Sequence, residues 1–242
     1  MLSPQKQNLC SRPSVCNTMA LSSRSFQRHL DDGSIPPNIR DKYNEPGRAY
    51  HNLNHIRHML NLIPSNRRRK RELTYATWFH DCVYDPKAKH GRNERDSIRL
   101  WEEHVEDCGC FISDIKDIVS LMIECTITHT LPSDISLGDE ETELLKRFLD
   151  MDMDILASPR AEYLDYAEKV RKEYSHFTDE QFRKGRIEFF RGELKKEKVF
   201  YLEENERKNG IAMENMKAEI EMLESEVARN EDPKNEDCGI SS

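Results

Sequence analysis

Apolar residues recur every three or four positions from Tyr43 to about residue 228, which is the spacing of amphipathic α-helices. In the clearest case, residues 53, 56, 59, 60 and 63 form one apolar face, and Pro64 marks its end. No stretch shows the sustained alternation with period two that indicates a β-strand. We therefore expect an all-α fold, a single helical bundle over residues 41–228 that ends in a long C-terminal helix.

Several helices of this bundle have recognisable ends. Ser113 is placed to cap one helix, and Thr178 with Gln181 has the form of a capping box. Besides the helix that follows His51, helices are expected over residues 72–81, from about 93 to 109, from 113 to 123, over 144–155 and 163–174, from 178, and from about 203.

The two ends of the chain differ in composition from the bundle. Residues 1–40 contain four prolines, one aromatic residue and no acidic residue before Asp31. Such a segment cannot bury enough apolar surface to offset its chain entropy. We expect residues 1–40 to be disordered and residues 229–242 to form a disordered acidic tail.

The apolar pattern also argues against membrane insertion and secretion. Apolar stretches run to four or five residues, far fewer than the roughly 20 that span a bilayer, and the N-terminus lacks the apolar core of a secretory signal. We therefore expect a cytoplasmic protein without membrane partners. The alternative is mitochondrial import, because Arg12, Arg24 and Arg28 lie among serines, although Pro4 and Pro13 interrupt the amphipathic helix of such a presequence.

Charge and cysteine content exclude further classes of protein. The chain has 37 Lys+Arg against 45 Asp+Glu, a net charge of −8 that repels nucleic acids, so no nucleic-acid binding is expected. Its seven cysteines include no CxxC pair, which predicts reduced thiols. The basic run at 67–71 is interpreted as a solvated loop between helices, with a nuclear signal or an anion-binding loop as the alternative.

Candidate chemistry begins with His80 and Asp81, which directly follow the apolar pair Trp78–Phe79. Burying an unpaired ionisable side chain is costly, and the cost falls if both side chains coordinate a cation. His51 and His55 are four residues apart, so they share one face of a partly buried helix. These residues are candidate metal ligands.

A set of aspartates adds carboxylates to these imidazoles. Asp150, Asp152 and Asp154 alternate with methionines inside an apolar stretch, so at least one carboxylate is internal and needs a cation or hydrogen-bond donors. A mixed histidine and aspartate set suits Mn²⁺, Fe²⁺, Co²⁺ or Zn²⁺, with Mg²⁺ less favoured by the imidazoles. We therefore expect a divalent metal ion as the cofactor.

The order histidine, His-Asp pair, distal aspartate in helical surroundings resembles the HD superfamily of metal-dependent phosphohydrolases, and within it a branch of predicted metal-dependent HD phosphohydrolases. The similarity covers about residues 41–225. It rests on YNEPGRAYHNLNHI at 43–56, A-x-W-F-H-D-x-V-Y-D-P at 76–86, N-E-x-x-S at 93–97, F-L-D-x-D at 148–152 and Y-x-x-Y-x-x-x-V-R-x-E-Y at 163–174.

The resemblance implies an HD-type helical fold in which the ligands of a divalent metal are His55 or His51, then His80, Asp81 and Asp152. It implies that a small phosphorylated substrate, the phosphate ester of a metabolite or nucleotide, is hydrolysed by metal-activated water. We predict that His55 is the first ligand, because an apolar run follows it, and that His51 lies on the phosphate side.

Three further residues join Asp81 as candidates for catalysis. Arg48 could clamp a phosphate, or form a structural ion pair with Glu45 or Glu94. His129 could donate to the leaving oxygen, serve a second metal or merely cap a helix. Glu94 could accept a hydrogen bond or position water near the metal, or simply complement a helix dipole.

Two other functions stay open at this point. One is a dinuclear HD enzyme, which adds histidines between the His-Asp pair and the distal aspartate, where His104 and His129 lie. The other is a non-catalytic HD module that binds a phosphorylated ligand. Metal stoichiometry separates the first alternative from a mononuclear phosphohydrolase, and turnover separates the second.

Overall fold

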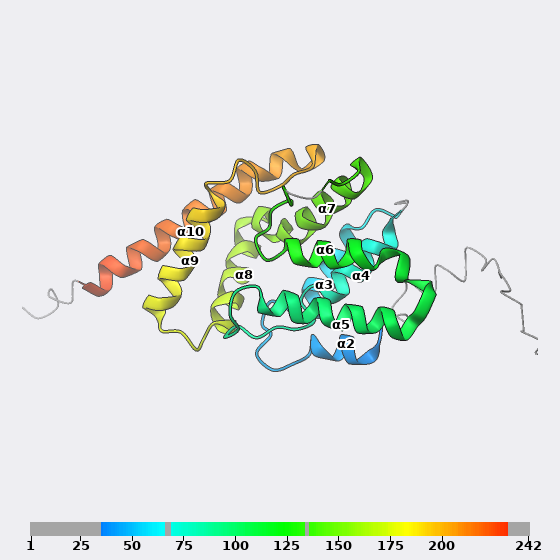
Figure 1. The fold of residues 1–242 in the computed structure, drawn as a ribbon. Coiled ribbons are helices and arrows are strands. Elements are labelled where there is room, and N and C mark those ends of the chain that lie inside the picture. Colours follow the sequence, from blue (N-terminus) through cyan, green and yellow to red (C-terminus); the bar gives the residue numbers. More distant parts are fainter. Residues whose placement is uncertain (1–34, 66–68, 134–135, 232–242) are drawn as a thin grey trace, which may run out of the picture. The chain divides into compact units, whose positions relative to one another are not determined.

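The computed structural model describes residues 35–65, 69–133 and 136–231, which belong to one compact unit that begins at Ile35 (Figure 1). These residues form α-helices and short 3₁₀-helices without any β-strand, which confirms the predicted all-α fold. The α-helices are α2 (Pro37–Lys42), α3 (Leu53–Leu62), α4 (Lys70–Phe79), α5 (Arg92–Cys108), α6 (Lys116–Cys125), α7 (Asp139–Asp152), α8 (Arg160–Glu173), α9 (Asp179–Glu193) and α10 (Glu206–Glu231); the 3₁₀-helices are η1 (Gly109–Phe111), η2 (Ser113–Ile115), η3 (Met153–Ala157) and η4 (Glu203–Asn205).

Local sequence signals account for several helix ends. Asn52 caps α3 by accepting a hydrogen bond from the backbone N–H of Asn54 at 2.8 Å, so His51 lies just before this helix. Thr178 and Gln181 form the predicted capping box of α9. Ser113, in contrast, opens η2 and does not cap α6, because the chain makes a 3₁₀ turn first, as is frequent at helix termini.

Buried apolar side chains form two clusters. The first core is built from α2 to α7 and extends along the chain from Ile35 to Met151. The second core is built from η3 to α10 and extends from Met153 to Leu223, with α9 packed beside α10 (Figure 1). Along the chain, Asp152 is the one residue between Met151 of the first core and Met153 of the second. The last turn of α7 therefore lies where the first core gives way to the second.

The N-terminal boundary of the bundle lies earlier than the sequence predicts. Ile35 and Ile39 are 4% and 2% exposed and belong to the first core, and Pro37 occupies the first position of α2, where proline is favoured. The expectation that residues 1–40 are disordered is therefore wrong for 35–40, whose two isoleucines bury enough surface to dock a short helix. Residues 1–34 lie outside the described residues.

The C-terminal helix is long, as expected. α10 continues to Glu231, three residues past the expected boundary at 228. The predicted acidic tail lies outside the described residues from 232 onward. Among the helices that are described, none combines the length and the apolar composition that crossing a bilayer requires.

Within the described residues, the cysteines agree with the expectation of reduced thiols, whereas the loop expected at 67–71 is wrong for Lys70 and Arg71, which begin α4 after its N-cap Arg69. Cys82, Cys108 and Cys125 are free thiols, and burial raises the pKa of Cys82 and of Cys125 to about 11. Arg69 forms ion pairs with Glu72 and Glu141, and Arg71 pairs with Asp114. Residues 67 and 68 of the basic segment lie outside the described residues, and the arginines at 69 and 71 are ion-paired.

Candidate metal centre

Three polar side chains meet at helix ends near the junction of the two cores. His55 lies in the first turn of α3, His80 is the C-cap of α4, and Asp152 is the last residue of α7. Each helix buries an apolar face in the first core, so its end is held in place by packing away from the polar atoms. Because each of these residues lies at a helix end, its polar atoms can point out of the apolar core while the rest of the helix stays packed in it.

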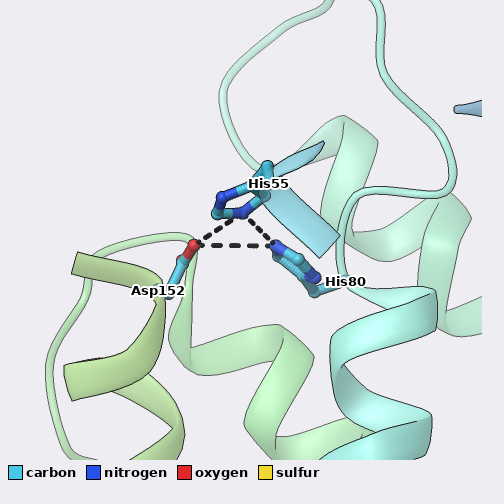
Figure 2. A group of neighbouring side chains, drawn as sticks. All are labelled: His55, His80 and Asp152. Atoms are coloured by element: carbon cyan, nitrogen blue, oxygen red, sulfur yellow. Dashed lines mark hydrogen bonds and ion pairs between the residues drawn. The ribbon is translucent and has the colours of Figure 1, made fainter. Parts of the chain in front are cut away.

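The geometry of this group, which we call the HHD cluster, is shown in Figure 2. His55 Nε2 lies 3.2 Å from His80 Nε2 and 3.2 Å from Asp152 Oδ1, and His80 Nε2 lies 3.6 Å from Asp152 Oδ1. One ligand atom from each residue lies within 4.8 Å of the others. The structure therefore brings together three of the predicted ligands, including His55 rather than His51.

Asp81 lies beside the cluster. Its Oδ2 is 3.1 Å from His80 Nε2 and 3.8 Å from His55 Nε2. Burial alone would favour the neutral acid, but His80 and His51 outweigh it and hold the pKa of Asp81 well below its usual range. Burial acts in the same direction on Asp152, where His129, His55 and His80 outweigh it and lower the pKa. Both aspartates are therefore carboxylates available to a cation.

The donor set fits a divalent transition metal. Ligand atoms held about 2.1 Å from one ion at right angles lie about 3 Å apart, close to the separations in the cluster. His80 donates its Nδ1–H to the carbonyl oxygen of Thr77 at 2.9 Å, which leaves Nε2 to face the cluster, the orientation that metal-binding histidines adopt. The side chains of His55 and His80 are 2% and 1% exposed, so water does little to screen them.

His51 occupies a different environment from His55. Its Nδ1 lies 2.6 Å from Oε2 of Glu173, and its backbone N–H donates to Oε1 of the same carboxylate at 2.9 Å. The imidazole stacks on the Tyr84 ring at 4.4 Å and is 24% exposed. Burial would lower its pKa, but the carboxylates of Asp81 and Glu173 outweigh burial and raise the pKa of His51.

Glu173 is the functional residue whose role the sequence argument missed. It is 4% exposed and accepts hydrogen bonds from the backbone N–H of Tyr50 at 2.7 Å and from the Tyr84 hydroxyl at 2.8 Å, besides its contacts with His51. The signal was present, because Glu173 continues the buried face of Tyr163, Tyr166 and Val170 at spacings of three and four. An ionisable residue in a buried face needs a partner.

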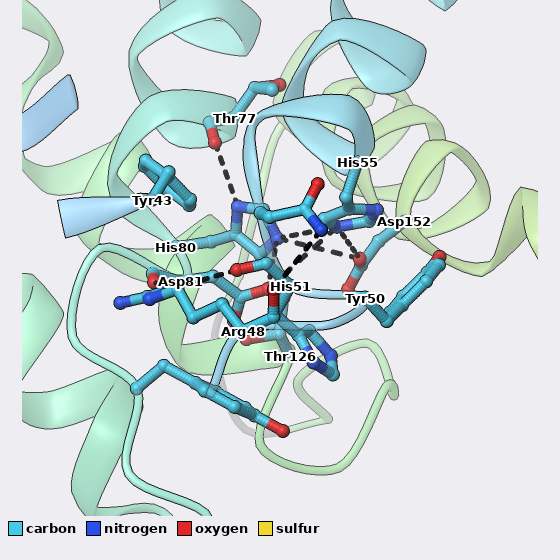
Figure 3. A network of polar contacts seen from close by, with 12 residues as sticks. Tyr43, Arg48, Tyr50, His51, His55, Thr77, His80, Asp81, Thr126 and Asp152 are labelled. Carbon is cyan, nitrogen blue, oxygen red and sulfur yellow. Dashed lines mark hydrogen bonds and ion pairs between the residues drawn. The ribbon is translucent and has the colours of Figure 1, made fainter. Parts of the chain in front are cut away.

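Arg48 does not have the free donors that a phosphate clamp requires. Its guanidinium is 2% exposed and donates to the carbonyl oxygens of His51, Asp81 and Cys82 at 3.1, 2.7 and 3.0 Å (Figure 3). It also pairs with Glu45 at 3.3 Å, the structural alternative named for it. The clamp interpretation is therefore wrong for this conformation: Arg48 ties the backbone at His51 to the backbone at Asp81.

The two other candidates for catalysis differ in position. His129 lies next to the cluster, with Nε2 3.1 Å from Asp152 Oδ2, and its φ of 49° is in the left-handed region. Tyr201 donates its hydroxyl to the carbonyl of His129 at 3.0 Å, which holds this backbone in place. Glu94 is half-buried in the first turn of α5, and within the described residues no hydrogen bond or ion pair links it to the cluster.

The three alternating aspartates have three different partners. Asp150 is 2% exposed and accepts hydrogen bonds from the backbone N–H groups of Tyr201 and Leu202 and from the Asn205 amide, at 2.7, 3.1 and 2.7 Å. Asp152 faces the cluster. Asp154 pairs with His58 at 2.8 Å and with Lys208 at 2.5 Å. The prediction that at least one carboxylate is internal and needs donors is confirmed by Asp150.

Comparisons with protein-family models, with curated proteins and with solved structures found no match to this chain. Its function therefore has to be inferred from the chemistry of the site.

Proposed function

We propose that this protein is a divalent-metal-dependent phosphohydrolase that hydrolyses the phosphate ester of a small metabolite or nucleotide. The observation that carries the proposal is the HHD cluster, in which two buried imidazole nitrogens and a carboxylate oxygen converge beside Asp81. The residues that would hold the metal are His55, His80, Asp152 and Asp81. A divalent ion bound there would supply Lewis acidity toward the phosphoryl group.

His51 is placed to transfer a proton to the leaving oxygen of the ester. Glu173 holds Nδ1 of His51, so the proton available for transfer is on Nε2, and the neighbouring carboxylates favour the protonated ring. The partial exposure of His51 lets its ring reach a substrate, whereas His55 is enclosed. The buried Glu173 carboxylate keeps the His51 ring in the same orientation whether the ring is protonated or neutral.

Arg48 and Tyr84 support this proton donor without contacting the reacting atoms. Arg48 fixes the distance between the backbone of His51 and that of Asp81, because one guanidinium donates to both carbonyl oxygens. Tyr84 covers one face of the His51 ring and donates to Glu173. Both residues act by positioning.

The test begins with elemental analysis of the purified chain, followed by assays of several phosphate esters with each of Mn²⁺, Co²⁺, Fe²⁺, Zn²⁺ and Mg²⁺. We expect His55→Ala and Asp81→Ala to lose metal on dialysis together with activity, while circular dichroism stays helical. His51→Ala is the matched control: it should keep its metal and lose turnover. Stoichiometric metal in Asp81→Ala, or loss of metal from His51→Ala alone, would contradict the assignment.

One contact favours a dinuclear version of the same enzyme. Asp152 directs Oδ1 toward His55 and Oδ2 toward His129, so its carboxylate has a histidine nitrogen near each oxygen. Two ions per chain, reduced to one in His129→Ala, would support this version. One ion per chain with no hydrolysis of any ester would instead favour a module that binds a phosphorylated ligand.

A further inference from the structure

The segment that joins α9 to η4, residues 194–202, extends from the second core to the candidate metal centre, and we call it the connector. Val199 and Phe200 are buried in the second core, whereas Tyr201 packs against the first. The backbone N–H groups of Val199 and Phe200 both donate to the side-chain oxygen of Asn209 at 2.9 Å, and the Asn209 amide donates to the carbonyl oxygen of Phe200 at 3.1 Å. The middle of the connector is therefore fixed on α10.

Two side chains of the connector hold consecutive carbonyl groups in the turn that follows α6. Lys196 Nζ donates to the carbonyl oxygen of Thr128 at 2.8 Å, and the Tyr201 hydroxyl donates to that of His129 at 3.0 Å. The hydroxyl groups of Thr128 and Thr130 also form a hydrogen bond with each other at 2.6 Å. The backbone on both sides of His129 is restrained in this way.

The conformation of His129 explains why such restraint is needed. Among the described residues, His129 is the one residue other than glycine with a positive φ. A left-handed conformation costs free energy for a residue with a Cβ atom, and it persists where the surroundings enforce it. Backbone strain of this kind is concentrated at functional sites. Here it accompanies an imidazole whose Nε2 lies 3.1 Å from Asp152 Oδ2.

The contact with His129 determines how Asp152 is oriented. A carboxylate can only accept hydrogen bonds, so Nε2 of His129 carries the proton and donates it to Oδ2. Oδ1 of Asp152 then faces His55 at 3.2 Å and His80 at 3.6 Å. The connector also restrains the same helix end directly, because two of its backbone N–H groups donate to Asp150.

We propose that His129, Lys196 and Tyr201 are positioning residues of the metal centre: the connector holds His129, and His129 holds Asp152 with Oδ1 directed toward the metal. The inference rests on the proposed function, since Asp152 is taken to be a metal ligand. It makes His129 the hydrogen-bond partner of a ligand in place of a ligand of a second ion. Loss of such a partner costs about 10- to 100-fold in metal affinity or activity.

The first measurement is the dissociation constant of Mn²⁺ for the full chain, determined by calorimetry. We expect His129→Ala to raise this constant about 10- to 100-fold, and Tyr201→Phe, which removes one hydroxyl, to raise it by a smaller factor. Lys196→Met is combined with Glu193→Gln, because Lys196 pairs with the buried Glu193 carboxylate at 2.6 Å. Glu193→Gln alone is the matched control and should leave the constant unchanged, since Lys196 still donates to Thr128.

A second measurement asks whether the connector acts through His129. Tyr201→Phe and the Lys196→Met, Glu193→Gln pair are each introduced into His129→Ala, and the Mn²⁺ dissociation constants are compared. We expect the connector changes to alter the constant by less than about twofold in that background, because the residue on which they act is gone. Equal effects with and without His129 would overturn the proposal, since they would indicate a general loss of structure.

A third measurement needs neither metal nor turnover. In ¹⁵N NMR spectra of the metal-free chain, the His129 ring, assigned by its absence from His129→Ala, should show a proton fixed on Nε2. Combining Tyr201→Phe with the Lys196→Met, Glu193→Gln pair should release the ring and average its two tautomers. An unchanged ring signal in that variant would overturn the proposal.

The remaining outcomes separate this proposal from the proposed function. Two Mn²⁺ ions per chain, falling to one in His129→Ala, would overturn it by making His129 a ligand. Release of the ring in a chain that binds no Mn²⁺ would support the hold of the connector on His129 and count against a metal-dependent phosphohydrolase. Metal-dependent hydrolysis that is unaffected by His129→Ala, with unchanged Mn²⁺ affinity, would have the opposite meaning.

Discussion

The first and second cores use their buried polar residues differently. In the first core, His55 and His80 direct nitrogen atoms toward a shared point together with two carboxylates. In the second core, Arg186 and Glu219 form a buried ion pair at 2.9 Å, with side chains 8% and 3% exposed. The first arrangement directs several metal-binding atoms toward one point, whereas the second pairs one cation with one anion and leaves Arg186 Nη2 and Glu219 Oε2 without hydrogen-bond partners among the described residues.

This difference assigns separate tasks to the two halves. The first core, with Asp152 at its boundary, supplies the candidate ligands. The chain that follows Asp152 supplies groups that hold the neighbours of these ligands: Glu173 orients His51, Tyr201, which packs against the first core, holds the carbonyl of His129, and the backbone at Tyr201 and Leu202 donates to Asp150. Substitutions of the metal ligands and substitutions of the residues that support them should therefore have different measurable effects.

The sharpest separation compares Asp152 with Asp150, two residues away. Asp152→Ala should lose its metal altogether, because a direct ligand is removed. Asp150→Ala should keep the metal but lower the free energy of unfolding by about 3 kcal/mol, since three donors lose their acceptor. Metal content and urea denaturation of both variants check this. Equal metal loss in the two would mean that the halves are not separable.

The ion pair of the second core should matter for stability and not for metal binding. Arg186→Met leaves Glu219 buried without its partner, which should cost about 3–5 kcal/mol. The double variant with Glu219→Met should recover most of that loss, because the uncompensated charge is gone. Denaturation curves test the stability, and elemental analysis should show unchanged metal in whichever variants fold. A double variant no more stable than the single one contradicts this account.

At the N-terminal boundary, Ile39→Ala should lower the free energy of unfolding by about 3 kcal/mol, because it opens a cavity in the first core. Asn38→Ala changes an exposed residue of the same helix and should stay within about 0.5 kcal/mol of the parent chain. Thermal denaturation of the two variants measures the difference. If they are equally stable, α2 is not an integral part of the core.

The smallest expected effect concerns the support of the proton donor. Glu173→Gln should lower kcat about 10- to 100-fold, by analogy with the loss of an outer-shell partner at a metal-bound histidine, with metal content unchanged. Because Glu173 raises the pKa of His51, that pKa should fall in the variant, which NMR titration would show. Tyr84→Phe removes only one donor to Glu173 and should have a weaker effect on both quantities.

The helical fold and much of the site could be predicted because both follow from local patterns. Spacing of apolar residues located the helices, and the ionisable pair after Phe79 located His80 and Asp81. Spacing could not distinguish His51 from His55, because a separation of four residues predicted that both would share one helical face. Asn52 resolves this, since its cap excludes His51 from α3 while His55 lies in the first turn.

Interactions over long sequence separations could not be predicted in the same way. The contacts of Arg48 with carbonyl oxygens, and of Glu173 with His51, join segments that only the packed structure brings together. Every residue has a carbonyl oxygen, so a sequence pattern cannot indicate which of them accept hydrogen bonds from an arginine. The packing of residues 35–40 was missed for a related reason: two isoleucines suffice when a core already exists to receive them.

The position of Glu173 at the end of α8 has a consequence for synthesis on the ribosome. A chain that has emerged only as far as Asp152 already carries all four candidate ligands, but not the carboxylate that orients His51. Under the proposed function, a growing polypeptide would therefore possess its four metal ligands before it possesses the carboxylate that orients its proton donor. Hydrolytic activity would then begin only after α8 had been synthesised and had docked.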